Sequence, residues 1–144
     1  MDRQELEALE SAAESKPLDV ESQIAAAYGN DRYGSEERAI LYYDKAWAIG
    51  VPEEERCRFL VGYGSTLRNV GRLDESVAIH RLAISDYPDF SAHHAFLALA
   101  LLESGQHQEA LAAALTALLD GGAPNLDGYD RALRGYRDQL LADS

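Results

Sequence analysis

The chain has 144 residues, a formal net charge of −12 at pH 7, and 47% hydrophobic residues. This composition excludes an intrinsically disordered chain, and the length allows one domain with a core of its own. Because an acidic protein repels phosphate groups, nucleic acids and anionic membranes are not expected as partners.

The charge is unevenly distributed along the chain. Residues 1–56 carry 14 of the 25 acidic residues but 6 of the 13 lysines and arginines. Such an excess has two readings, since it either keeps the protein in solution or steers a basic partner toward it.

Several features predict a cytoplasmic protein. The N-terminal stretch lacks the apolar segment of a signal peptide, and no apolar run approaches the roughly 18 residues of a membrane helix. The single cysteine, Cys57, has no partner for an intrachain disulfide, which agrees with a reducing compartment.

The first half of the chain predicts three helices. Residues 2–15 place their apolar side chains on one side, and Pro17 ends this helix. Asp19 caps a second helix, which runs out near residues 29–30 and is followed by a polar loop at residues 31–34. Ser35 opens a third helix, which stops at Gly50 and in which Trp47 is expected to pack against the N-terminal helix.

The second half of the chain predicts two helical hairpins and one last helix. Residues 53–88 break at Gly71 and residues 89–122 break at Gly105, while the run from Gly121 to Pro124 stops the second hairpin. Residues 126–142 carry apolar side chains at spacings of four, three and four, as an amphipathic helix does. No segment shows the period-2 alternation of a strand.

The two hairpins are copies of each other. Shifting residues 57–88 by 34 places Tyr63 on Leu97, Gly64 on Ala98 and Gly71 on Gly105. The small residues in these copies mark points where helices approach closely. The turn glycines, with Gly34 at the corresponding place in the first hairpin, are expected to adopt positive φ.

The repeat resembles the tetratricopeptide repeat, whose pattern is W-x2-L-G-x2-Y, then A-x3-F, then P. The middle copy reads Leu60-x2-Tyr63-Gly64-x2-Leu67, then Ser76-x3-His80, then Pro88; the third reads His94-x2-Leu97-Ala98-x2-Leu101, then Ala110-x3-Ala114; the first matches at Ala39-x3-Tyr43.

The resemblance covers about residues 18–122 and is closest to small three-repeat members of bacterial type. It implies an all-α, right-handed helical-hairpin solenoid that forms a single domain over residues 1–144. Its expected parts are an N-terminal helix at 2–15, repeats at 18–50, 53–88 and 89–122, and a C-terminal capping helix at 126–142.

The same resemblance implies a non-enzymatic scaffold that binds a protein or peptide in a concave groove built from the first helix of each repeat. The implied groove residues are Arg58, Val61, Ser65, Arg68 and Asn69 in the middle repeat, Phe96 and Leu99 in the third, and Tyr136 in the last helix. The middle set also shares one helical face by its spacing alone.

Two alternatives remain open at this point. The side chains of Phe96, Leu99 and Tyr136 either line an open groove or pack against one another, so that the last helix fills the groove. In addition, the apolar surface of the third repeat or of the capping helix would suit a self-associating homodimer.

Catalysis, metal binding and a cofactor are not expected. The four histidines show no His-x3-His spacing, and there is no Cys-x2-Cys pair. His93 and His94 are adjacent and therefore point about 100° apart on a helix. Cys57 lacks an evident orienting group, so we expect a half-buried core thiol there.

Overall fold

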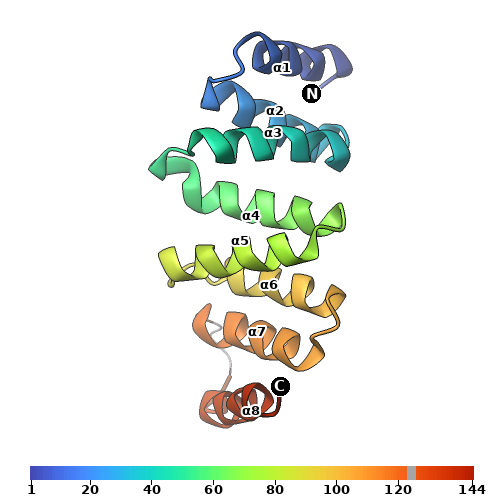
Figure 1. Ribbon diagram of the computed structural model, residues 1–144. Coiled ribbons are helices and arrows are strands. Elements are labelled where there is room, and N and C mark those ends of the chain that lie inside the picture. Colours follow the sequence, from blue (N-terminus) through green and yellow to red (C-terminus); the bar gives the residue numbers. More distant parts are fainter. Residues whose placement is uncertain (123–125) are drawn as a thin grey trace. The chain divides into compact units, whose positions relative to one another are not determined.

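The computed structural model describes residues 1–122 and 126–144, which form eight α-helices and no strand (Figure 1). The helices are α1 (Arg3–Ser15), α2 (Val20–Tyr33), α3 (Glu36–Ile49), α4 (Glu53–Asn69), α5 (Leu73–Asp86), α6 (Ala92–Glu103), α7 (His107–Asp120) and α8 (Asp130–Asp143). The predicted all-α, helical-repeat fold is confirmed. Of the predicted stop after α7, Ala123 and Pro124 lie outside the described residues.

The helices form two compact units. Unit 1 comprises Met1–Gly71 and holds α1 to α4, while unit 2 comprises Arg72–Ser144 and holds α5 to α8. The boundary falls between the two helices of the middle repeat. A single domain over residues 1–144 therefore stays a prediction.

Side-chain caps explain where the first three helices begin. The Asp2 carboxylate accepts a hydrogen bond from the Glu5 amide at 2.8 Å, and the Glu5 carboxylate accepts one from the Asp2 amide at 2.7 Å. Asp19 caps α2 through the Ser22 amide, and Ser35 caps α3 through the Arg38 amide, each at 3.2 Å. These bonds satisfy amides that have no partner inside the helix.

The second helix is longer than predicted. The sequence indicated an end near residues 29–30, but α2 continues to Tyr33. Asn30 lies inside this helix, and its side-chain amide donates to the Ala26 carbonyl at 3.0 Å. The predicted polar loop at 31–34 is therefore mostly helix.

The turn glycines serve two different needs. Gly71 and Gly105 have φ values of 85° and 81°, which confirms the predicted left-handed turns. The same prediction is wrong at Gly34, where φ is −113°. A Cβ at Gly34 would lie 3.1 Å from Leu6 and would also overlap the Asn30 side chain, so close approach explains the glycine there.

Aromatic rings form the core of unit 1. The Tyr43 ring on α3 is fully buried and lies 5.3 Å from the centroid of Phe59 and 5.7 Å from that of Tyr63 on α4. The Tyr43 hydroxyl donates to the Asp31 carboxylate at 2.8 Å. The polar end of the ring is thus satisfied while its face packs, as a buried tyrosine requires.

Trp47 does not take its predicted place. It was expected against the N-terminal helix, but its ring stacks on Phe59 of α4 at 6.3 Å, with the Arg56 guanidinium 5.7 Å from its centroid. Trp47 lies near the C-terminal end of α3, and α3 packs against α4 there.

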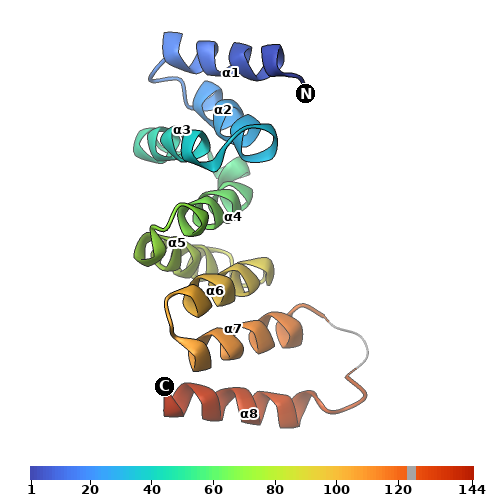
Figure 2. The ribbon, with the colours of Figure 1, turned by 90° about the vertical axis from the view of Figure 1, so that its right-hand side faces the viewer.

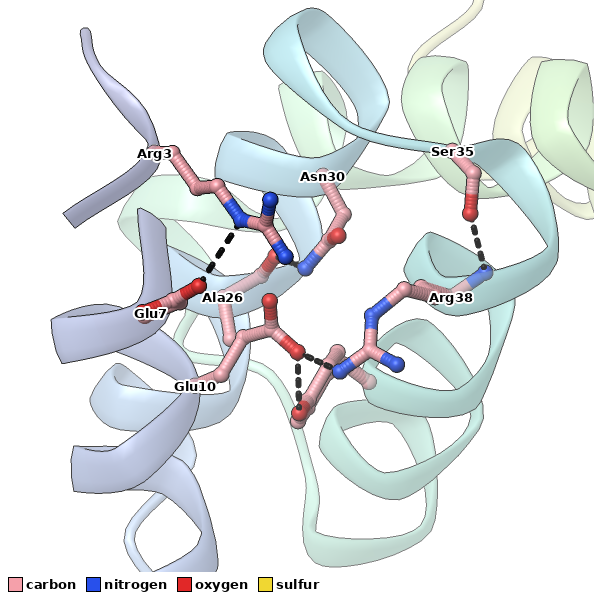
Figure 3. Close-up of polar contacts among 8 residues, drawn as sticks. Arg3, Glu7, Glu10, Ala26, Asn30, Ser35 and Arg38 are labelled. Atoms are coloured by element: carbon pink, nitrogen blue, oxygen red, sulfur yellow. Dashed lines mark hydrogen bonds and ion pairs between the residues drawn. The ribbon is translucent and has the colours of Figure 1, made fainter. Parts of the chain in front are cut away.

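The N-terminal helix attaches to the α2–α3 hairpin through small residues and one ion pair. Leu6 and Leu9 of α1 lie over Gly29, where a Cβ would be 3.0 Å from each leucine. The nearly buried Glu10 carboxylate forms an ion pair with Arg38 of α3, which Figure 3 shows turned toward it.

A second core lies in unit 2. Buried side chains of α5, α6 and α7 form it, with Ile84 packed against them. They are Val77, Leu97, Ala98, Ala100, Leu101, Ala110 and Ala113. The predicted small residues at Ala98 and Ala110 are thus buried where α6 and α7 meet.

The last helix is attached more weakly than the others. Figure 2 shows α8 alongside α7, and the two helices pack together, yet none of the α8 residues is buried. Arg134 reaches the Asp120 carboxylate at 2.9 Å and the Leu119 carbonyl at 3.3 Å, and Arg137 donates to the Thr116 hydroxyl at 3.2 Å. Polar contacts therefore carry much of this interface.

Gly62→Ala is expected to destabilise unit 1. A Cβ at Gly62 on α4 would overlap the hydroxyl of Tyr43, a fully buried ring that cannot move aside freely. Such overpacking costs about 1–3 kcal/mol. The free energy of unfolding in urea, followed by the fluorescence of the single tryptophan, Trp47, measures this loss.

Gly135→Ala is the matched control for that substitution. A Cβ at this position of α8 meets nothing within 4 Å, so the change favours the helix slightly through backbone entropy and is expected to leave the Trp47 transition undiminished. Equal effects of the two substitutions would refute the placement of Gly62 against Tyr43.

Arg38→Ala is expected to loosen α1. The change leaves the nearly buried Glu10 without its cation, and lost charge-assisted bonds of this kind cost about 1–3 kcal/mol. Arg3→Ala removes an exposed pair with Glu7 and should change stability by less than about 0.5 kcal/mol. Urea unfolding compares the two variants, and an Arg38 effect no larger than the Arg3 effect would contradict the role of this pair.

Candidate protein-interaction surfaces

Five of the predicted groove residues lie on α4 in unit 1. The opposite side of this helix is buried and includes Phe59, Leu60 and Leu67. The predicted set consists of exposed Arg58 and Asn69 together with half-buried Val61, Ser65 and Arg68. The outward face of α4 is therefore mixed, with polar groups around a short aliphatic centre.

Arg58 is held over an aromatic ring. Its guanidinium carbon lies 5.1 Å from the centroid of Tyr28 on α2, and the Tyr28 hydroxyl donates to the Glu55 carboxylate at 3.2 Å. Burial and then the Glu55 charge raise the pKa of Tyr28 far above its usual value, so the hydroxyl remains a donor. The cluster places one oriented cation at the surface where α2 and α4 meet.

The two polar residues at the end of α4 differ in availability. Asn69 is exposed, and its side-chain amide donates to the Glu36 carboxylate of α3. Arg68 is half-buried. Exposed hydrogen bonds of the Asn69 type exchange readily with water, so Asn69 remains accessible to a ligand whereas Arg68 is partly covered.

In unit 2 the outward face of α6 is apolar. Leu99 is 43% exposed and Leu102 is 53% exposed, while Leu97 and Leu101 on the other side are buried. Phe96 is half-buried and stacks on the ring of His80 from α5, with centroids 6.1 Å apart. The predicted pair of Phe96 and Leu99 thus lies at the surface beside a buried histidine.

Tyr136 is separate from that pair. It lies on α8, which packs against α7, and it is 70% exposed. This exposure argues against the alternative in which Tyr136 packs against Phe96 and Leu99. Both tyrosines of the last segment, Tyr129 and Tyr136, present most of their surface to solvent.

Cys57 and His93 are both shielded from solvent to different degrees. Cys57 is half-buried, and burial followed by the Glu53 charge raises the pKa of its thiol. Burial and then His94 lower the pKa of His93, which is fully covered and lies 5.0 Å from the Phe90 ring centroid. His93 is therefore a neutral packing residue, and Cys57 is a poor nucleophile at neutral pH.

Two further findings concern the residues that the structure describes. Within 1–122 and 126–144, no three His, Cys, Asp or Glu side chains are grouped so as to hold a metal ion. In the same residues, no helix combines the length and the apolar character that a membrane span requires.

Sequence reasoning did not single out the polar cluster around Glu10, Asn30 and Arg38 in unit 1 (Figure 3). Its signal was present in the spacing of Glu7, Glu10 and Glu14, which places three carboxylates on one side of α1. The sequence leaves the acidic excess with two readings, solubility or the steering of a basic partner, because it does not show that α3 supplies Arg38 opposite these acids.

Comparisons with known proteins agree with this architecture. A family model described as "Tetratrico peptide repeat" matches residues 21–140. Among solved structures, the chain is similar to "MamA MSR-1 C2" with a TM-score of 0.71 and 19% identity, over 82% of this chain. The match covers 66% of that structure, just under two thirds of its length. A search of the curated proteins finds no match.

The Cys57 thiol is expected to react slowly with a disulfide reagent. Because the pKa of the thiol is raised, the thiolate forms at higher pH in the native protein than in the unfolded chain. The reaction rate of the native protein therefore also rises at higher pH. Reaction with a chromogenic disulfide, native and in urea, measures both curves. A native curve at the same or lower pH would contradict the raised pKa.

Proposed function

Because the chain belongs to the tetratricopeptide repeat family, we propose that it is a non-enzymatic scaffold that binds a protein or a peptide. Recognition is assigned to the outward faces of the first helices of the repeats, which are α2 and α4 in unit 1 and α6 in unit 2. The second helices, α3, α5 and α7, serve to hold these faces in place. A cytoplasmic location is part of the proposal and rests on the single, disulfide-free cysteine.

The apolar face of α6 carries this proposal. Leu99 and Leu102 expose large aliphatic surface on a first helix, beside half-buried Phe96. Apolar side chains grouped on a rigid helix supply binding energy at little entropic cost, because the partner desolvates a surface that is already ordered.

The face of α4 would supply a polar contribution in unit 1. Arg58, held over Tyr28, offers an oriented guanidinium that suits a carboxylate or a backbone carbonyl of a ligand. Val61 and Ser65 lie on the same face and add a small aliphatic contact and a hydroxyl. Arg68 and Asn69 extend this face toward the C-terminal end of the helix.

Self-association is a second candidate function, favoured by the concentration of exposed apolar side chains in unit 2. They are Phe90, Leu99, Leu102, Leu111, Leu118, Tyr129, Tyr136 and Leu141. Large exposed apolar patches often mark an interface. Light scattering over a dilution series distinguishes the candidates, because a scaffold with an open face is monomeric and a homodimer keeps twice the mass.

Leu99→Ser is expected to weaken partner capture about tenfold or more, as loss of an interface anchor does. The assay uses immobilised full-length protein and a lysate of cells that express it, with bound proteins quantified by mass spectrometry. Leu111→Ser is the matched control, since Leu111 is 52% exposed on α7 of the same repeat.

The two variants separate the first helix from the second. Retained capture by Leu111→Ser with loss in Leu99→Ser supports the assignment to α6. Equal capture by both variants and the unmodified protein would refute it.

A further inference from the structure

A cleft of about 550 Å³ lies in unit 1 between α1 and the α2–α3 hairpin. This volume falls within the range of about 300–1,000 Å³ that is typical of ligand sites. The cleft involves α1, which precedes the residues matched by the family model. It is built from different residues than the faces of α4 and α6.

The charged groups that line the cleft are not balanced. Three carboxylates, those of Glu7, Glu10 and Glu14, meet two guanidinium groups, those of Arg3 and Arg38. Arg3 pairs with Glu7, and Arg38 pairs with Glu10. Glu14 has no ion pair among the described residues, so the lining carries one negative charge in excess.

Tyr42 of α3 lies next to these acids. It is buried, and its hydroxyl lies 3.3 Å from the Glu10 carboxylate. Burial and then the Glu14 charge raise the pKa of Tyr42. Glu10 and Glu14, one turn apart on α1, therefore face the same region of the cleft.

A buried acceptor without a partner provides an independent observation. Asn30 lines the cleft and is fully buried. Its amide nitrogen donates to the Ala26 carbonyl at 3.0 Å, which fixes the orientation of the group and leaves Oδ1 without a hydrogen-bond donor. Figure 3 shows the Asn30 amide on the cleft side of α2, between Arg3 and Arg38. Buried polar groups of this kind normally have a partner.

We propose that this cleft binds the guanidinium group of an arginine side chain in a partner peptide. A guanidinium carries five donors in a planar fork and a fixed positive charge. Its donors suit acceptors such as the Asn30 oxygen and the Glu14 carboxylate, which both line the cleft, and its charge balances the excess negative charge. The surplus of acids in residues 1–56 would draw such a basic segment toward unit 1.

The proposal rests on the proposed function only in that the occupant is a peptide. The site is tested apart from the faces of α4 and α6, so failure here leaves those assignments untouched. The probe is N-acetyl-Gly-Arg-Gly-amide, titrated into the full chain and followed by the shifts of backbone amide resonances. A peptide with citrulline in place of arginine has the same shape without the charge.

Saturable shifts at Glu14 and Asn30 are expected for the arginine peptide, with affinity at least about tenfold lower for the citrulline peptide. Equal affinity for the two peptides, or shifts spread over all acidic surfaces without saturation, would overturn the proposal. A lysine peptide with equal or higher affinity would also overturn the assignment to a guanidinium.

Glu14→Gln tests the excess carboxylate. This residue is exposed on α1, so the fold is expected to survive the change, and binding of the arginine peptide should fall about tenfold. Glu37→Gln is the control, because it removes one charge from unit 1 at an exposed position of α3 that does not line the cleft. If both variants lost the same affinity for the arginine peptide, the peptide would be attracted by the net charge of unit 1 and not by the cleft, which would overturn the proposed site.

Ser11→Arg is a second test variant, and it removes none of the charged groups that line the cleft. Ser11 lines the cleft and is exposed, so an arginine there would place its own guanidinium in the proposed site. The amide shifts at Glu14 and Asn30 caused by the peptide should then disappear. Unchanged peptide binding by this variant would contradict the location.

Discussion

The buried Tyr43 side chain is the constraint on which unit 1 depends. Its ring lies against Phe59 and Tyr63, so α4 can approach α3 only where a glycine, Gly62, leaves room for the phenol. Its hydroxyl must still be satisfied, and Asp31 at the end of α2 does this at 2.8 Å. The Tyr43 side chain therefore contacts α2 and α4 from α3, and these contacts fix which face of α4 points outward.

The packing of each core decides which side chains of α4 in unit 1 and of α6 in unit 2 face outward. Inward residues of α4 are consumed by aromatic packing, which leaves Arg58, Val61 and Ser65 outside. Inward residues of α6 are aliphatic except for His93 and pack against α5 and α7, which leaves Leu99 and Leu102 exposed. Two helices at equivalent places in their repeats thus present different chemistry, one polar with an oriented cation and the other apolar.

Much of the fold could be read from the sequence, because helix periodicity, N-caps and turn glycines act locally. The starts at Asp19 and Ser35 and the left-handed glycines at 71 and 105 are of this kind. The errors involve side-chain contacts that the sequence pattern does not show. Gly34 is small because Leu6 and Asn30 lie close to it, and Trp47 packs on Phe59 of the following helix. The longer α2 includes Asn30, whose side chain donates to the Ala26 carbonyl of the same helix. The predicted groove residues lie on α4, α6 and α8, but only packing shows that Arg58 meets Tyr28 and that Tyr136 is mostly in solvent.

The shallow attachment of α8 has a consequence for the dynamics of unit 2. A helix with no buried residue, held through Arg134 and Arg137, has a small free energy of local opening, since little apolar surface returns to water when it detaches. Its amide protons are therefore expected to exchange with solvent sooner than those of α6 and α7. Because charged contacts are screened by salt, the opening becomes more frequent as ionic strength rises. The C-terminal segment thus behaves as a separate cooperative element whose docking on α7 depends on the solution conditions.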